Sequence, residues 1–87
     1  MRIKEGYQLC KVKDTHVVVA TGNAVMDFDG LVTLNDTGVL LWKMLKQERT
    51  AQELTDALVK TYQIDAATAG KDVDDFIAKL RGVGFLV

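Results

Sequence analysis

The pattern of apolar and polar positions changes near Asn35 of this 87-residue chain. Before that residue, short valine-rich runs alternate with turn residues, which is typical of β-strands. After it, apolar residues recur every three or four positions, as along one face of an α-helix. At this length we expect one domain over residues 1–87, with an α+β fold in which the sheet comes first.

The N-terminal part predicts a small antiparallel sheet. Asp14 favours a tight turn, because aspartate tolerates turn geometry and bonds its own backbone. Asp29 and Gly30 form a typical two-residue hairpin turn. The sequence leaves open whether residues 25–28 continue the second strand or stand alone. Strands are expected over residues 7–13, 16–20 and 31–34.

The C-terminal part predicts three helices. Asn35 and Asp65 are expected to cap the first and third, and Thr50 with Glu53 forms a capping box for the second. Gly82 and Gly84 are expected to end the third helix in the left-handed conformation, and residues 85–87 to fold back onto the core. The predicted order is therefore a sheet followed by three helices, with a helix-turn-helix-like second half. The apolar stripes comprise Val39, Trp42 and Leu45, then Leu54, Ala57, Leu58 and Tyr62, then Ala69, Val73, Phe76, Ile77 and Leu80.

Charge and composition exclude several classes of function. The eleven basic and twelve acidic residues give a net charge of −1 and are mixed along the chain. No basic face is visible, which argues against nucleic-acid binding. No apolar run approaches the roughly 20 residues that span a bilayer, and the N-terminus has no secretory pattern. Cys10 is the single cysteine, so we expect no internal disulfide and a cytoplasmic protein.

The chain offers few groups for catalysis. Cys10 and His16 are the single thiol and imidazole, and a thiolate–imidazole pair would need them to meet across the first hairpin. Their ordinary interpretation is a small apolar strand residue and a polar residue beside a turn. A zinc site needs four ligands, usually cysteine or histidine, and the chain has only these two such residues. Glycine motifs that bind phosphate are also absent. We therefore expect neither an enzyme nor a bound metal or cofactor.

The third predicted helix begins with three neighbouring acids, Asp72, Asp74 and Asp75. They suit the helix dipole as solvated residues, and they could also bind a basic partner. Trp42 is expected in the core, although a tryptophan can also serve as a stacking platform.

The function left to consider after catalysis and metal binding is recognition of a peptide through backbone hydrogen bonds. A short sheet has two edges, and an extended peptide can add to one of them as a further strand. If residues 31–34 form an edge beside the third helix, the two elements enclose a groove. The alternative is an edge covered by a loop or by a second copy.

Several stretches of the chain resemble the PqqD-like family, also called RiPP recognition elements, which bind ribosomally made peptides that enzymes then modify. The most specific stretch is FDGLVTLNDTG at residues 28–38, which runs into LWKML at residues 41–45. Further similarity lies in TAQEL at residues 50–54, in residues 72–80, and in Gly84-Phe85-Leu86.

The resemblance implies a non-catalytic chaperone that binds the leader of a precursor peptide as an added strand. It also implies a winged helix-turn-helix-like fold of three strands and three helices, a modifying enzyme as partner, such as a radical SAM enzyme, and no bound cofactor. The exposed sheet edge and the N-terminal hairpin leave open a monomer or a strand-exchanged dimer. The peptide-binding residues that it implies are Leu31, Val32, Thr33 and Leu34 on the third strand and Asp72, Asp75, Phe76 and Lys79 on the third helix.

Two features depart from chaperones dedicated to pyrroloquinoline quinone. The chain has no proline before the third strand, and KQER at residues 46–49 follows the first helix where those chaperones carry Asp-Gly. The expected pathway is therefore pyrroloquinoline quinone synthesis or that of another modified peptide. The alternative function is a winged-helix DNA-binding regulator, which four acids on the third helix disfavour, because they would repel phosphates.

Overall fold

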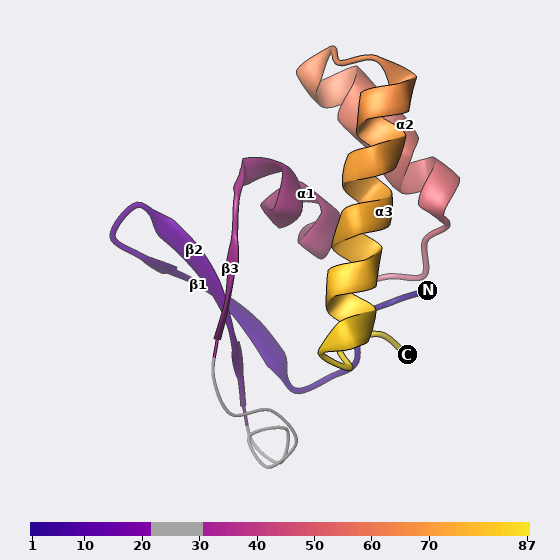
Figure 1. Ribbon diagram of the computed structural model, residues 1–87. Helices are drawn as coiled ribbons and strands as arrows, with labels where there is room; N and C mark the ends of the chain where they lie inside the picture. Colours follow the sequence, from indigo (N-terminus) through magenta and orange to yellow (C-terminus); the bar gives the residue numbers. More distant parts are fainter. Residues whose placement is uncertain (22–30) are drawn as a thin grey trace.

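A three-stranded sheet is followed by three helices in the computed structural model, which describes residues 1–21 and 31–87 (Figure 1). The sheet is antiparallel, with strand order β1-β2-β3. This confirms the predicted α+β architecture. The expected turn at Asp29 and Gly30 and the expected strand at residues 25–28 lie outside the described residues. The elements are β1 (Tyr7–Val12), β2 (Thr15–Ala20), β3 (Leu31–Leu34), α1 (Asp36–Met44), α2 (Ala51–Tyr62) and α3 (Ala66–Gly82).

The first hairpin is closed by the two residues Lys13 and Asp14, with Val12 opposite Thr15. Lys13 takes a positive φ of 57°, a conformation that a two-residue hairpin turn requires. The register places Cys10 opposite Val17, and places His16 opposite Lys11. Residues directly opposite each other share a face, so the Cys10 and His16 side chains point to opposite faces of the sheet. The thiolate–imidazole pair is thereby excluded.

The core lies where one face of the sheet meets the helices. Trp42 of α1 is fully buried at its centre, with its ring edge-on to Phe85 at a centroid distance of 6.0 Å. Phe85 also stacks on Tyr7 of β1 at 4.1 Å. The apolar stripes of α2 and α3 close the core, because Leu54, Leu58 and Leu80 are completely buried.

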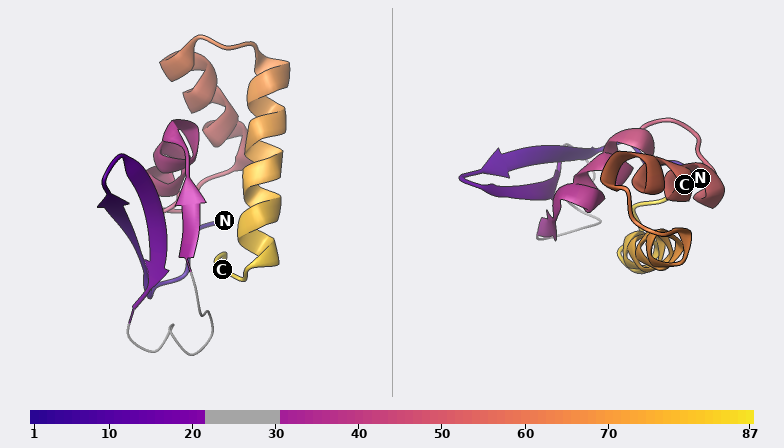
Figure 2. Two further views of the ribbon diagram at one scale, coloured as in Figure 1. Left: turned by 60° about the vertical axis from the view of Figure 1, so that its left-hand side comes forward. Right: turned by 90° about the horizontal axis from the view of Figure 1, so that it is seen from above.

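The two ends of the chain are joined beside the helices. Ile3 forms a β-bridge with Leu86, and the Val87 N–H donates to the Arg2 carbonyl at 2.9 Å. The expected return of residues 85–87 to the core is confirmed, since Phe85 is fully buried. Both ends lie near the C-terminal end of α3 (Figures 1 and 2).

Three side chains cap the N-termini of the helices, as the sequence predicts. Asn35 and Asp65 accept hydrogen bonds from the backbone N–H groups of Gly38 and Thr68. At the start of α2, the Thr50 hydroxyl accepts from the Glu53 N–H, and the Glu53 carboxylate accepts from the Thr50 N–H.

These backbone donors lower the pKa of both carboxyl groups below the ordinary values of 4.5 for Glu53 and 3.8 for Asp65. A lowered pKa in the folded state favours folding at a pH above the unfolded value. That contribution is lost as the pH falls through the folded-state pKa.

Replacing Thr50 by alanine is expected to lower the free energy of unfolding by about 1 kcal/mol, because the Glu53 N–H loses its capping acceptor. Urea denaturation followed by circular dichroism measures the change. Thr61→Ala is the control, since Thr61 is exposed within the same helix and alanine favours helix there. Equal stability of the two variants would show that the capping box contributes nothing.

Two local expectations were wrong. Tyr62 is not a core residue: its side chain is 38% exposed at the last turn of α2, beyond the reach of the apolar stripe formed by Leu54 and Leu58. Gly82 does not take the left-handed conformation, because α3 continues through it; Gly84 does, with φ of 77°. None of the helices in the described ranges is long and apolar enough to cross a bilayer.

Candidate functional site

The hydrogen-bonding pattern of the hairpin determines which groups of β2 face β3. The Thr21 N–H donates to the Gly6 carbonyl at 2.7 Å, just before β1 begins. Hydrogen-bonded pairs recur every second residue along an antiparallel ladder. Counting in twos from this pair, Val19, Val17 and Thr15 direct their backbone groups to β1. The intervening residues Val18 and His16 therefore bond toward β3.

Strand β3 consequently has two residues whose backbone groups face outward. Val32 and Leu34 lie opposite Val18 and His16 and complete the ladder. Leu31 and Thr33 alternate with them, so their N–H and C=O groups point away from β2. Because β3 is at the end of the strand order, these groups lie on an edge of the sheet that no other described strand covers.

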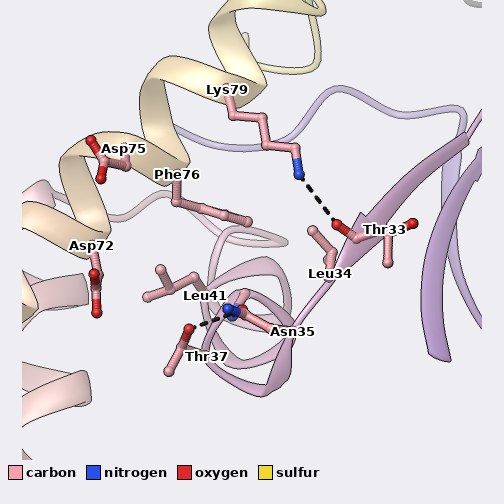
Figure 3. Close-up of a pocket in the computed structure, with 10 residues that line it drawn as sticks. Thr33, Leu34, Asn35, Thr37, Leu41, Asp72, Asp75, Phe76 and Lys79 are labelled. Carbon is pink, nitrogen blue, oxygen red and sulfur yellow. Dashed lines mark hydrogen bonds between the residues drawn. The ribbon is translucent and has the colours of Figure 1, made fainter. Parts of the chain in front are cut away.

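Helix α3 runs beside this edge, and one of its lysines contacts it. The Lys79 ammonium donates to the Thr33 carbonyl at 3.2 Å, in a hydrogen bond that is exposed to solvent (Figure 3). This contact independently shows that the Thr33 carbonyl points outward, in agreement with the ladder. A lysine at such an edge is a common protection against unwanted strand pairing.

A pocket of about 440 Å³ lies between β3, the start of α1 and α3. Leu34, Leu41 and Phe76 are buried residues that form its apolar floor. Asp72 and Asp75 stand on the rim formed by α3, as the close-up shows (Figure 3). The other residues that line the pocket are Thr33, Asn35, Thr37, Gly38 and Lys79.

The close approach of α1 and α3 depends on a glycine. A Cβ atom at Gly38 would lie 3.4 Å from Cε1 of Phe76 and 3.1 Å from the capping oxygen of Asn35. The second distance is tighter than ordinary contact, so a larger residue would displace the Asn35 side chain. Gly38 therefore allows the first turn of α1 to keep its cap while the Phe76 ring packs against it.

The charges on the α3 rim are unbalanced. Asp72 and Asp75 are both exposed and lie three residues apart, on one side of the helix. Across the described ranges, neither carboxylate has a basic group within ion-pair distance. Lys79 lies further along α3, where its ammonium is bonded to Thr33. The pocket is thus acidic toward α1 and basic toward the middle of β3.

The structure brings together six of the eight residues implied by the resemblance: Thr33, Leu34, Asp72, Asp75, Phe76 and Lys79. Val32 is placed differently, since its side chain is buried in the core and its backbone groups face β2. Leu31 contributes outward backbone groups.

Sequence reasoning missed the contribution of α1 to the pocket. Asn35 and Trp42 were interpreted as a cap and a core residue, and the intervening positions were assigned no part in a site. The structure adds Asn35, Thr37, Gly38 and Leu41 to the lining. Gly38 in the first helical turn could have indicated this contribution, because glycine is unfavourable inside a helix and its presence suggests that another element approaches closely.

The arrangement suits recognition of an extended chain. It combines outward backbone donors and acceptors with an apolar floor and a charged rim, as peptide recognition by strand addition requires. Among the residues that the structure describes, no three potential metal ligands cluster together.

Comparison with known proteins gives three results. A search among curated proteins finds no significant match. TbiB1 in complex with the TbiA(beta) leader peptide shares the fold, with a TM-score of 0.76, 22% identity, and coverage of 99% of this chain and 94% of that chain. Lasso peptide synthetase B1 complexed with the leader peptide has a TM-score of 0.74 and 18% identity, with 97% and 93% covered.

The family model for coenzyme PQQ synthesis protein D (PqqD) matches residues 22–86, which span β3 and all three helices. The matched range includes every residue that lines the pocket. The chain therefore belongs to the PqqD family.

Proposed function

We propose that this protein is a non-catalytic recognition module that binds the leader of a precursor peptide as an additional strand on β3. The observation that carries the proposal is the free edge at Leu31 and Thr33 beside the pocket. The two solved structures named above, which share this fold, are complexes with leader peptides. In this role the module presents the peptide to a modifying enzyme of the cytoplasm, such as a radical SAM enzyme.

The edge alone supplies too little free energy for firm binding. Leu31 and Thr33 carry two outward N–H donors and two outward C=O acceptors, and the Thr33 carbonyl already accepts a hydrogen bond from Lys79. At about 1 kcal/mol for each net hydrogen bond, even four bonds give at most roughly 4 kcal/mol, which corresponds to millimolar affinity. Peptide side chains in the pocket must therefore supply the rest. The edge sets the register of the peptide, and the floor of Leu34, Leu41 and Phe76 provides most of the affinity.

A paired capture experiment tests this function. The tagged protein and its Thr33→Pro variant are incubated with lysate of the native organism, and eluted peptides are identified by mass spectrometry. We expect a short precursor peptide with the wild type and its loss with the variant, which removes an outward N–H. Recovery of nucleic acid without peptide would instead support the winged-helix regulator. Equal recovery of the peptide by both baits would contradict binding at this edge.

Peptide binding is expected to weaken only slightly with salt. The rim offers two carboxylates and one ammonium, so a few ion pairs at most are screened. We expect the affinity for a captured peptide to fall less than tenfold between 50 and 200 mM NaCl by fluorescence anisotropy. A protein that contacts six to ten phosphates loses about 10³–10⁵-fold over this range. A loss of that size would contradict the peptide-binding proposal.

A further inference from the structure

The charges along the groove follow a fixed order that a bound peptide must match. At one end Lys79 meets Thr33, and in the middle Phe76 packs near Gly38 and Leu34. At the other end Asp72 lies across from the start of α1 (Figure 3). Along α3, Phe76 lies four positions after Asp72, a rise of about 6 Å. The groove therefore passes from a basic end across an apolar middle to an acidic end.

This spacing matches the repeat of an extended peptide. Side chains on one face of a strand recur every second residue, about 6.6 Å apart. When one such side chain occupies the apolar floor at Phe76, the next on that face lies beside Asp72 and Asp75. Neither carboxylate has an ion-pair partner within 4 Å among the described residues. Lys71 and Lys79 each lie four positions from Asp75. The like charges of Asp72 and Asp75, three positions apart, nevertheless disfavour the helix. A cationic side chain relieves that repulsion.

The nearby N-terminus of α1 does not offset the acidic rim. Asn35 already accepts the N–H of Gly38, and Asp36 places a further carboxylate in the first turn. The partial positive charge at the N-terminus of α1 is thus already compensated by Asn35 and Asp36 of the chain itself. The acidic end of the groove keeps its preference for a cation.

We propose that the groove selects peptides in which a lysine or arginine lies two residues from a large apolar residue. The proposal rests on the proposed strand addition and specifies the peptide that the edge accepts. The apolar side chain enters the floor, and the basic side chain pairs with Asp72 and Asp75. The basic residue precedes the apolar one if the peptide runs antiparallel to β3, and follows it if the peptide runs parallel.

Selection from a displayed library of random twelve-residue peptides tests the proposal. The baits are the wild type, Thr33→Pro, and a double variant with Asp72→Lys and Asp75→Lys. Both acids are exposed, so the reversal leaves the core intact. We expect the wild type to enrich a basic residue two positions from an apolar one, and the double variant to enrich an acidic residue there. Asp74→Lys is the matched control, because Asp74 is exposed on α3 outside the pocket lining.

A synthetic copy of the most enriched peptide quantifies the effect. Changing its basic residue to glutamate is expected to weaken binding to the wild type about tenfold, and to strengthen binding to the double variant. The Asp74→Lys control should keep the wild-type preference.

Three outcomes would overturn the proposal, each in a recognisable way. If the enriched peptides bind the wild type but not Thr33→Pro, and none has a basic residue two positions from an apolar one, the charge preference is wrong and strand addition stands. Enriched peptides that bind Thr33→Pro as well as they bind the wild type contradict strand addition itself. No enrichment above an uncoated surface contradicts both.

Discussion

Replacing Thr33 by proline is expected to weaken peptide binding about 100-fold while the domain stays folded. The Thr33 N–H faces the free edge, so the substitution breaks no bond to β2. An added strand would lose one hydrogen bond and meet the proline ring, at a cost of about 3 kcal/mol. Isothermal titration with a captured leader peptide measures the loss, and thermal unfolding checks the fold.

Thr33→Ala is the matched control for this effect. It removes the exposed Thr33 side chain but keeps the backbone N–H, so the affinity is expected to change less than threefold. If both variants bind as the wild type does, the peptide does not use this edge. If alanine weakens binding as much as proline does, the Thr33 side chain is the determinant instead of the backbone.

Replacing Trp42 by alanine is expected to lower the free energy of unfolding by about 3–5 kcal/mol. The side chain is fully buried, and it packs edge-on against Phe85 while the Lys46 ammonium lies 5.8 Å from its ring centroid. Its removal leaves a large cavity in a core that has few other aromatic residues. An 87-residue domain has roughly 4–13 kcal/mol of stability in total, so the variant is expected to be partly unfolded at 37 °C.

Urea denaturation followed by circular dichroism tests this expectation without relying on the fluorescence of Trp42. Tyr62→Ala is the aromatic control, because Tyr62 is 38% exposed at the end of α2, and we expect a cost below about 1 kcal/mol. Similar costs for the two variants would show that Trp42 does not anchor the core.

The helices were predictable because local signals determine where they begin. Asn35, Thr50 and Asp65 each bond a backbone N–H within their own first turn, so a few neighbouring residues suffice to identify the caps. The stripe of α3 was equally clear, since Val73, Ile77 and Leu80 recur at helical spacing and are all buried. Tyr62 fits the stripe of α2 by spacing, but its exposure depends on where the neighbouring elements end.

The site was only partly predictable because it depends on contacts between distant segments. The sequence places residues 31–34 in a strand, but it does not show which amides face outward; that follows from the register with β2. Likewise, Lys79 and Thr33 are 46 residues apart in the chain, and their hydrogen bond depends on how α3 packs beside β3. Leu41 belongs to both the core stripe and the pocket floor, and periodicity cannot distinguish the two.

The bond between Lys79 and Thr33 also bears on how copies of this protein behave toward one another in concentrated solution. An open strand edge is a template on which identical chains can stack into ribbons. If two copies paired symmetrically through β3, each copy would have to break its hydrogen bond between Lys79 and the Thr33 carbonyl. The two Lys79 ammonium groups would then lie close together at the interface and repel each other. A foreign peptide brings no such second lysine. A guest strand competes with one lysine and a second copy with two, so Lys79 disfavours pairing between identical chains more than it disfavours a guest.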